Sequence, residues 1–249
     1  MTPPGPGAPA PALELRGIDK RFGAVHANRA ISFAIAAGTV HGLIGENGAG
    51  KSTLMNIVYG FHPADAGEIL VHGRRVDIRR PHDAIRAGIG MVHQHFMLVE
   101  KFTVLENVIL GVEGARRLAA GLARARAELE RLARDYALEV PLDAPVESLP
   151  VGLQQRVEIL KALYRGAEIL ILDEPTAVLT PQEADALFRM LAQLRAQGKT
   201  VILVTHKLRE IMAITDRVTV MRQGAVVAEV ATGATSPREL AEKMVGRAV

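Results

Sequence analysis

Eight residues in the first quarter of the chain match a pattern that binds phosphate. Residues 45–52 read Gly-Glu-Asn-Gly-Ala-Gly-Lys-Ser and fit G-x-x-x-x-G-K-[ST]. Glycines let a loop bend closely around a phosphate without Cβ clashes, and its backbone N–H groups can then point at the anion. The lysine can reach the outer phosphates of a nucleotide, and the serine hydroxyl can bind Mg²⁺. The pattern therefore predicts binding of a nucleoside triphosphate together with Mg²⁺.

The segments on either side of this loop give it the expected context. Residues 39–44 predict a short buried strand, and residues 52–59 predict a helix with apolar Leu54, Ile57 and Val58. A turn between strand and helix brings the anion-attracting helix N-terminus to the same point, which disfavours a plain glycine-rich turn. The residues expected to contact the nucleotide are Gly45, Asn47, Gly48, Ala49, Gly50, Lys51, Ser52 and Thr53.

A second candidate site lies at the end of another buried strand. Residues 167–173 form an almost continuous apolar run, typical of a parallel strand covered on both faces, and the run ends in Asp173 and Glu174. Open parallel sheets bind their ligands at the carboxyl ends of the strands. Asp173 is suited to hold the Mg²⁺ that Ser52 contacts, directly or through water, and Glu174 to accept a proton from an attacking water. Alone, the two acids would equally fit a polar strand end before a proline turn.

Composition excludes several other classes of protein. The chain has 249 residues, a formal net charge of +3 and no cysteine, so a disulfide framework and a cysteine nucleophile are excluded. We find no apolar run of membrane-span length and no secretory signal pattern, and expect a cytoplasmic protein. Residues 1–11 predict a disordered proline-rich tail, and residues 12–249 a single domain. In the arginine-rich helix expected at 115–135, pairs such as Arg126–Glu130 and Arg131–Asp135 stand at i,i+4, which favours a solvated face over nucleic-acid binding.

Several motifs, in order, resemble those of the ATP-binding subunits of ABC transporters. The residues that carry the resemblance are Lys20-Arg21-Phe22-Gly23, 45–53, Val92-His93-Gln94-His95, 148–157, 169–176 and Val204-Thr205-His206. It covers about residues 12–248. The sequences of residues 155–163 and 175–183 are similar to those of the sugar- and nucleoside-importer branch. Residues 90–99 are most similar to its nucleoside members, which are linked to basic membrane lipoproteins. Two such modules are usually fused in that branch, and this chain resembles the first.

The resemblance implies a fold, an activity and a set of partners. The expected fold is α/β, with a RecA-like P-loop core at 38–95 and 165–225, an antiparallel β-subdomain, and a helical subdomain at about 96–164. The expected reaction is hydrolysis of ATP to ADP and phosphate, powering import of a nucleoside or simple sugar. The implied partners are a second ATP-binding module, transmembrane permease subunits and, indirectly, an extracytoplasmic substrate-binding protein, but no nucleic acid. The chain would lie peripherally on the cytoplasmic face of the plasma membrane.

The resemblance also implies roles for three residues that chemistry alone would not single out. Phe22 would stack on adenine, although a packing role is equally open for a lone aromatic residue. Gln94 would sense the γ-phosphate and Mg²⁺, while the segment that follows, about 95–107, contacts the permease. His206 would bind the γ-phosphate and orient water. A metal site at His93 and His95 is rejected, because alternating strand residues face opposite sides and a third ligand is lacking.

One segment departs from the family pattern. In such pairs each ATP lies between the phosphate loop of one module and an L-S-G-G-Q segment of the other. Here the corresponding residues, which we call the signature segment, are Leu149-Pro150-Val151-Gly152-Leu153. Pro150 lacks the serine hydroxyl, and a lost hydrogen bond to a charged group costs about 1.5–3 kcal/mol. We therefore expect two unequal ATP sites and a heterologous partner, unless the amides of Val151 and Gly152 suffice.

Two other functions remain alternatives at this point. One is an ABC ATPase of DNA repair or translation, which would have no membrane partner. The similarity of several segments to importers, and the nearly balanced charge of the chain, argue against this function. A nucleotide-binding regulatory module would bind ATP without turnover, as Pro150 permits.

Overall fold

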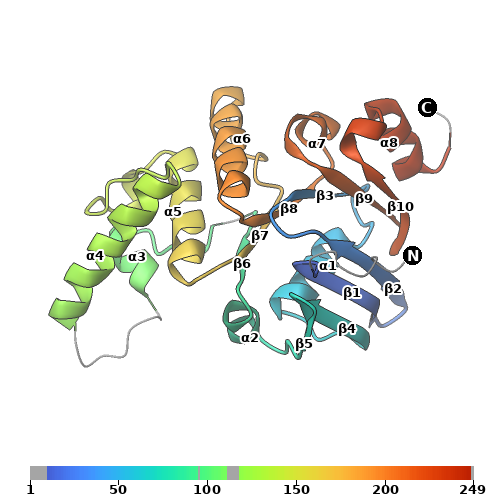
Figure 1. Ribbon diagram of the computed structural model, residues 1–249, viewed down its shortest axis with the longest axis horizontal. Coiled ribbons are helices and arrows are strands. Elements are labelled where there is room, and N and C mark those ends of the chain that lie inside the picture. Colours follow the sequence, from blue (N-terminus) through green and yellow to red (C-terminus); the bar gives the residue numbers. More distant parts are fainter. Residues whose placement is uncertain (1–9, 95, 111–117, 248–249) are drawn as a thin grey trace.

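The computed structural model describes residues 10–94, 96–110 and 118–247, and the fold contains two β-sheets (Figure 1). The first is a four-stranded antiparallel sheet with the order β2-β1-β4-β5. Its strands are β1 (Leu13–Phe22), β2 (Val25–Ile35), β4 (Ala66–Val71) and β5 (Arg74–Val76). The second is a six-stranded sheet with the order β10-β9-β3-β8-β7-β6, parallel except for the pairing of β10 with β9. Its strands are β3 (Val40–Ile44), β6 (Ile89–Val92), β7 (Ile169–Asp173), β8 (Thr200–Thr205), β9 (Arg217–Arg222) and β10 (Ala225–Ala231).

The helices cover the sheets from several sides. The described helices are α1 (Lys51–Tyr59), α2 (Pro81–Arg86), α3 (Val104–Ile109), α4 (Leu118–Asp135), α5 (Val151–Tyr164), α6 (Pro181–Ala196), α7 (Leu208–Ile214) and α8 (Pro237–Val245), with short 3₁₀ turns at Val146–Ser148 and Thr232–Ala234. Figure 1 shows α3, α4 and α5 grouped at one end of the molecule, and α6, α7 and α8 along one side of the six-stranded sheet. No helix within the described ranges is long and apolar enough to cross a membrane.

Alternate residues of the central strands belong to two different cores. Leu170 and Leu172 of β7 pack with the helices α5 and α6, whereas Ile169 and Ile171 pack with α1 and the antiparallel sheet. Because side chains alternate across a strand, a strand buried on both faces must be apolar at nearly every position. This is why residues 169–172 read as a continuous apolar run, and the predicted α/β class is confirmed.

Predicted helix starts and ion pairs agree with the structure in most cases. The helix predicted to start at Pro181 does so behind a capping box, in which Thr180 and Glu183 satisfy each other's backbone N–H groups. In α4, Arg131 pairs with Asp135 as predicted and also with Glu128. Arg126 instead pairs with Asp143, outside the helix. Of the tail predicted at 1–11, residues 1–9 lie outside the described residues, as does His95.

Candidate nucleotide site

The phosphate loop lies between β3 and α1, as its sequence predicts. Gly48 and Gly50 have φ angles of 80° and 97°, in the left-handed region that favours glycine. A Cβ at Gly50 would lie 2.3 Å from the carbonyl oxygen of Ala27, so a larger residue cannot fit there. The loop backbone therefore depends on glycine both for its conformation and for its close packing.

Lys51 is the first residue of α1 and is almost entirely buried. Its Nζ donates to the carbonyl oxygens of Gly45 at 2.8 Å and Glu46 at 3.1 Å. Burial lowers the pKa of Lys51, and the carboxylates of Glu174 and Asp173 act in the opposite direction. The ammonium group is thus fixed against the loop, close to two acids from a different part of the chain.

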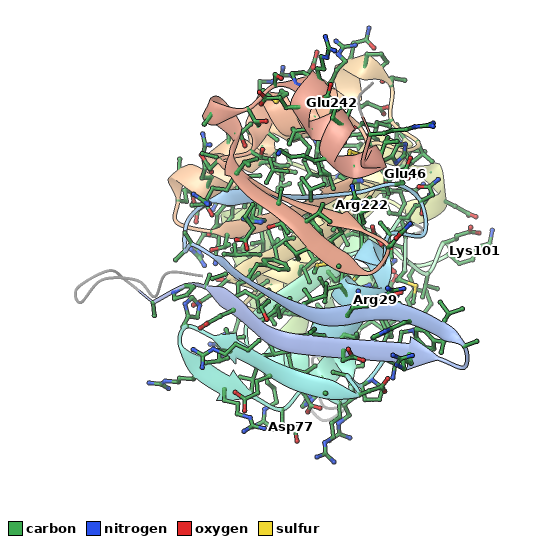
Figure 2. All side chains as sticks on the ribbon, turned by 90° about the vertical axis from the view of Figure 1, so that its right-hand side faces the viewer. Arg29, Glu46, Asp77, Lys101, Arg222 and Glu242 are labelled. Carbon is green, nitrogen blue, oxygen red and sulfur yellow. The ribbon has the colours of Figure 1, made fainter. Side chains whose placement is uncertain are left out.

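Two segments that the sequence did not predict form hydrogen bonds to the backbone of the phosphate loop. Asn28 of β2 is fully buried, and its Nδ2 donates to the carbonyl oxygen of Gly50 at 3.0 Å. The turn between β9 and β10 adds two backbone bonds, from Gly224 to Ala49 at 3.1 Å and from Arg29 to Gly224 at 2.7 Å. Figure 2 shows Arg29 on β2 beneath the hairpin that carries Arg222. Short sequence windows hold no signal for these contacts, because they join distant segments.

An open cleft of about 890 Å³ lies over the loop. Its walls contain most of the predicted nucleotide residues, and the described residues that line it include Phe22, Val25, residues 47–53, Gln94, Glu174, Ala177, His206 and Gln223. Phe22 ends β1 and is 43% exposed, with the Lys20 ammonium 5.4 Å from its ring centroid. An exposed aromatic ring at the rim of a cleft offers a surface for stacking a flat base.

The carboxylate of Asp173 and the hydroxyl of Ser52 together offer oxygen ligands for a divalent cation. Asp173 ends β7, and the hydroxyl of Ser52 donates a hydrogen bond to its carboxylate. Burial raises the pKa of Asp173, and the Ser52 contact opposes that shift. Within the described part of the chain, the buried Oδ1 of Asp173 has no hydrogen-bond partner. A buried carboxylate oxygen without a partner, beside a serine hydroxyl, fits Mg²⁺, which prefers oxygen ligands.

Glu174 and His206 come from the ends of neighbouring strands and form a pair. Glu174 Oε1 lies 2.9 Å from His206 Nδ1, across 32 residues of sequence. The backbone of Glu174 has a φ of 48°, uncommon for a residue with a side chain, and its N–H donates to Val204 at 2.9 Å. Strained backbone of this kind persists where the surrounding structure enforces it, and it concentrates at functional sites. The arrangement places a carboxylate and an imidazole together at the cleft.

The signature segment lies away from this cleft. Pro150 is the N-cap of α5, one position before the first helical turn, and is exposed. Its carbonyl oxygen accepts from the N–H groups of Leu153 at 2.9 Å and Gln154 at 3.1 Å. Gly152 lies beside Glu183, whose Oε1 would be 2.8 Å from a Cβ placed on that glycine. Pro150 and Gly152 line a separate small depression, and so they are not brought to this chain's own phosphate loop.

Comparisons with known proteins agree with the geometry. A family model described as ABC transporter matches residues 28–177. The nucleoside import ATP-binding protein NupA of Lactococcus lactis is 49% identical over 95% of this chain, and the ribose import ATP-binding protein RbsA of Hahella chejuensis is 46% identical over 95%. The glucose import ATP-binding protein TsgD13 of Haloferax volcanii is 47% identical over 96%. The matches cover 47%, 48% and 48% of these relatives, so the chain spans about half their length.

Solved structures give the same result for the fold. The ADP conformation of the ATP-binding cassette MJ1267 has a TM-score of 0.81 at 26% identity, covering 95% of this chain and 99% of that one. A nucleotide-free cassette of an ABC transporter has a TM-score of 0.79 at 25% identity, covering 95% of each chain. The resemblance and the fold predicted from the sequence are thereby confirmed, and the chain belongs to the ABC transporter family.

Proposed function

We propose that this chain is the ATP-hydrolysing module of an importer for a small solute, a nucleoside or a simple sugar. The observation that carries the proposal is the cleft in which the phosphate loop meets the Glu174–His206 pair, with Asp173 hydrogen-bonded to Ser52 of the loop. The relatives named above support the transported class, since their names refer to import of nucleosides, glucose and ribose.

In the proposed mechanism, the loop and the N-terminus of α1 bind the β- and γ-phosphates of ATP, and Phe22 stacks on adenine. Lys51 offsets the negative charge that develops on the phosphates during transfer. Ser52, Gln94 and Asp173 are the residues that would hold Mg²⁺, which when bound neutralises charge on the outer phosphates. Glu174 accepts a proton from the attacking water, and His206 orients that water beside the γ-phosphate.

The proposal includes a paired arrangement of modules. The phosphate loop, Asp173, Glu174 and His206 of this chain form one site with the signature segment of a partner module. The exposed N-terminus of α5, with Pro150 and Gly152, contributes to the partner's site. Because Pro150 lacks a hydroxyl, that second site is the weaker one, which favours a heterologous or fused partner over a homodimer.

A surface near Gln94 supports contact with a permease. An apolar depression of about 230 Å³, which we call the permease-facing depression, is lined by Tyr59, Phe61, His93, Met97 and other residues. Phe61 and Met97 are 44% and 62% exposed. Exposed apolar side chains around a hollow are typical of protein interaction sites. A module bound there to a permease, with its solute-binding protein outside, would be peripheral at the cytoplasmic face of the membrane.

The proposal is tested by ATP binding and hydrolysis with the purified chain. ATP with Mg²⁺ should bind the wild-type chain, and Lys51→Ala should abolish that binding. Lys101→Ala is the matched control, because this exposed lysine pairs with Glu147 and is not among the residues that line the cleft. Equal binding by Lys51→Ala and wild type would refute the assignment of the site. Co-purification of the chain with integral permease subunits would distinguish an importer from an ATPase of DNA repair or translation. Measurable ATP hydrolysis would distinguish an importer from a regulatory module that binds ATP without turnover.

A further inference from the structure

Two charged side chains of α5 hold the backbone of a single residue, Met97. The N–H of Met97 donates to Oε1 of Glu158 at 2.7 Å, and the carbonyl oxygen of Met97 accepts from Nζ of Lys161 at 2.9 Å. Glu158 and Lys161 stand one helical turn apart, with 3.7 Å between Oε2 and Nζ. Both polar backbone groups of Met97 are therefore bound to opposite charges on the same helix.

The pair is buried to a degree that needs an explanation. The side chains of Glu158 and Lys161 are 5% and 14% exposed. Burial raises the pKa of Glu158 and lowers that of Lys161, and the attraction between the two charges opposes both shifts. Removing two charges from water is unfavourable unless further hydrogen bonds satisfy them, and a buried ion pair is weak evidence for stability alone. Here the additional hydrogen bonds go to Met97, which indicates a role in fixing its backbone.

Met97 occupies a position between the nucleotide cleft and the permease-facing depression. It follows Gln94, which lines the cleft, by three residues, while its own side chain lines the depression. Glu158 and Lys161 also line that depression. Gln94 and Met97, three positions apart in the sequence, thus line the two different sites.

The same helix is bonded to the catalytic strand end as well. Nε2 of Gln155, a buried side chain, donates to the carbonyl oxygen of Pro175 at 2.8 Å, directly after Glu174. The N-terminus of the helix carries Pro150, which faces outward. The helix α5 is thus hydrogen-bonded to two of these segments, at Met97 and Pro175, and carries the third at its own N-terminus.

We propose that Glu158 and Lys161 are a positioning pair that makes α5 and the backbone of Met97 move as one body. The inference rests on the proposed function, since it assigns to these residues the coupling between the nucleotide cleft and the permease-facing depression. It depends on the order of the charges, with the carboxylate at the N–H and the ammonium at the carbonyl oxygen. A pair that contributed only mutual attraction would work equally well in the opposite order.

Exchanging the two charges tests this dependence. In Glu158→Lys with Lys161→Glu, the net charge and the attraction between the two side chains are retained, but each charge meets the wrong backbone group. Amide hydrogen exchange at Met97 should become about ten- to a hundredfold faster, the factor expected for loss of a hydrogen bond to a charged group. In the complex with permease, solute imported per ATP hydrolysed should fall at least fivefold, while ATP binding at the cleft is unchanged.

Three further variants keep the experiment interpretable. The exposed α8 pair Arg238–Glu242, exchanged in the same way, is the matched control and should leave both readouts unchanged. Lys161→Arg keeps a donor for the carbonyl oxygen and should retain the wild-type coupling. If the exchanged protein does not fold, Glu158→Gln replaces it: this variant keeps an acceptor for the Met97 N–H but removes the charge, so exchange at Met97 should accelerate less than tenfold while coupling falls.

Some outcomes would overturn the inference. Unchanged protection of Met97, or unchanged import per ATP, in the charge-exchanged protein would reject it. Unchanged coupling in Glu158→Gln would do the same. Failure of the wild-type chain to bind ATP would instead reject the proposed function, so the two failures are distinguishable.

Discussion

Replacing Pro150 by serine addresses the one segment that departs from the family pattern. Pro150 has φ −54° and ψ 151°, values that serine adopts without strain, and its carbonyl oxygen already accepts the first bonds of α5. Serine at an N-cap accepts a hydrogen bond from the helix backbone through a lone pair, and its O–H is still able to donate to a phosphate. The backbone therefore need not move, and the substitution adds a hydroxyl at the exposed helix N-terminus.

The size of the effect follows from one added hydrogen bond at each site. A hydrogen bond to a charged group contributes about 1.5–3 kcal/mol, or roughly ten- to a hundredfold in an equilibrium constant. A dimer of two copies of this chain would contain two equivalent signature contacts. We therefore expect the dissociation constant of the ATP-bound dimer to fall about 10²- to 10⁴-fold with Pro150→Ser. The new N-cap contributes about 1 kcal/mol relative to alanine, while loss of the proline ring costs about 0.4–1 kcal/mol through the unfolded chain, so Pro150→Ser should be more stable than Pro150→Ala but close to wild type.

The assay uses a variant that we expect to bind ATP but to hydrolyse it only slowly. Pro150→Ser is introduced into a Glu174→Gln chain, and ATP-dependent dimerisation is measured by analytical ultracentrifugation with Mg²⁺. Pro150→Ala is the matched control, because it removes the proline ring without adding a hydroxyl, and it should leave dimerisation weak. Urea unfolding of the monomers measures the capping effect separately. An unchanged dimer dissociation constant in Pro150→Ser would refute the reasoning that this position weakens the site.

Two further predictions concern catalysis and pH. Glu174→Gln should bind ATP normally but hydrolyse it at least a hundredfold more slowly, since the amide cannot accept a proton from water; a steady-state phosphate-release assay with near-normal turnover would reject the role of Glu174. His41 is buried, with Nε2 2.8 Å from Thr219 Oγ1, and burial and then the charge of Arg217 lower its pKa to about 4. The folded state therefore holds this imidazole neutral, whereas the unfolded chain takes up the proton near pH 6.5. The contribution of His41 to the free energy of unfolding is therefore fully present above pH 6.5 and is lost as the pH falls toward 4. At pH 5 the free energy of unfolding should be lower by about 2 kcal/mol. In His41→Gln, urea unfolding at pH 7.5 and pH 5 should show a correspondingly smaller loss, and an identical loss in both proteins would contradict the assignment.

Much of the nucleotide site could be predicted from short segments of sequence. The phosphate loop could be predicted from eight residues, because its glycines, lysine and serine together match one phosphate-binding pattern. Asp173 and Glu174 could be placed at a strand end because the preceding residues are apolar without interruption. The start of α6 could be placed at Pro181 because the capping residue Thr180 precedes it. The assigned roles of Phe22, Gln94 and His206 remain predictions that rest on the family.

Other parts of the site could not be found in this way. The support of Gly50 by Asn28 joins residues 22 positions apart, and the hydrogen bonds of Met97 to Glu158 and Lys161 span 61 and 64 positions. Asn28, Glu158 and Lys161 belong to no pattern with a chemical meaning of its own. A polar residue within a strand, or a charged residue within a helix, reads as an ordinary surface position until its neighbours in space are known.

The sequence by itself identified the candidate residues for phosphate and Mg²⁺, since those groups lie within one turn of chain or at the end of one strand. Only the tertiary structure decided which groups act together. The strand order β3-β8-β7 brings the ends of three strands to one edge, so that Lys51, Glu174 and His206 share a cleft. The two faces of that sheet pack into two different cores, and packing between distant segments leaves no trace in the spacing of neighbouring residues.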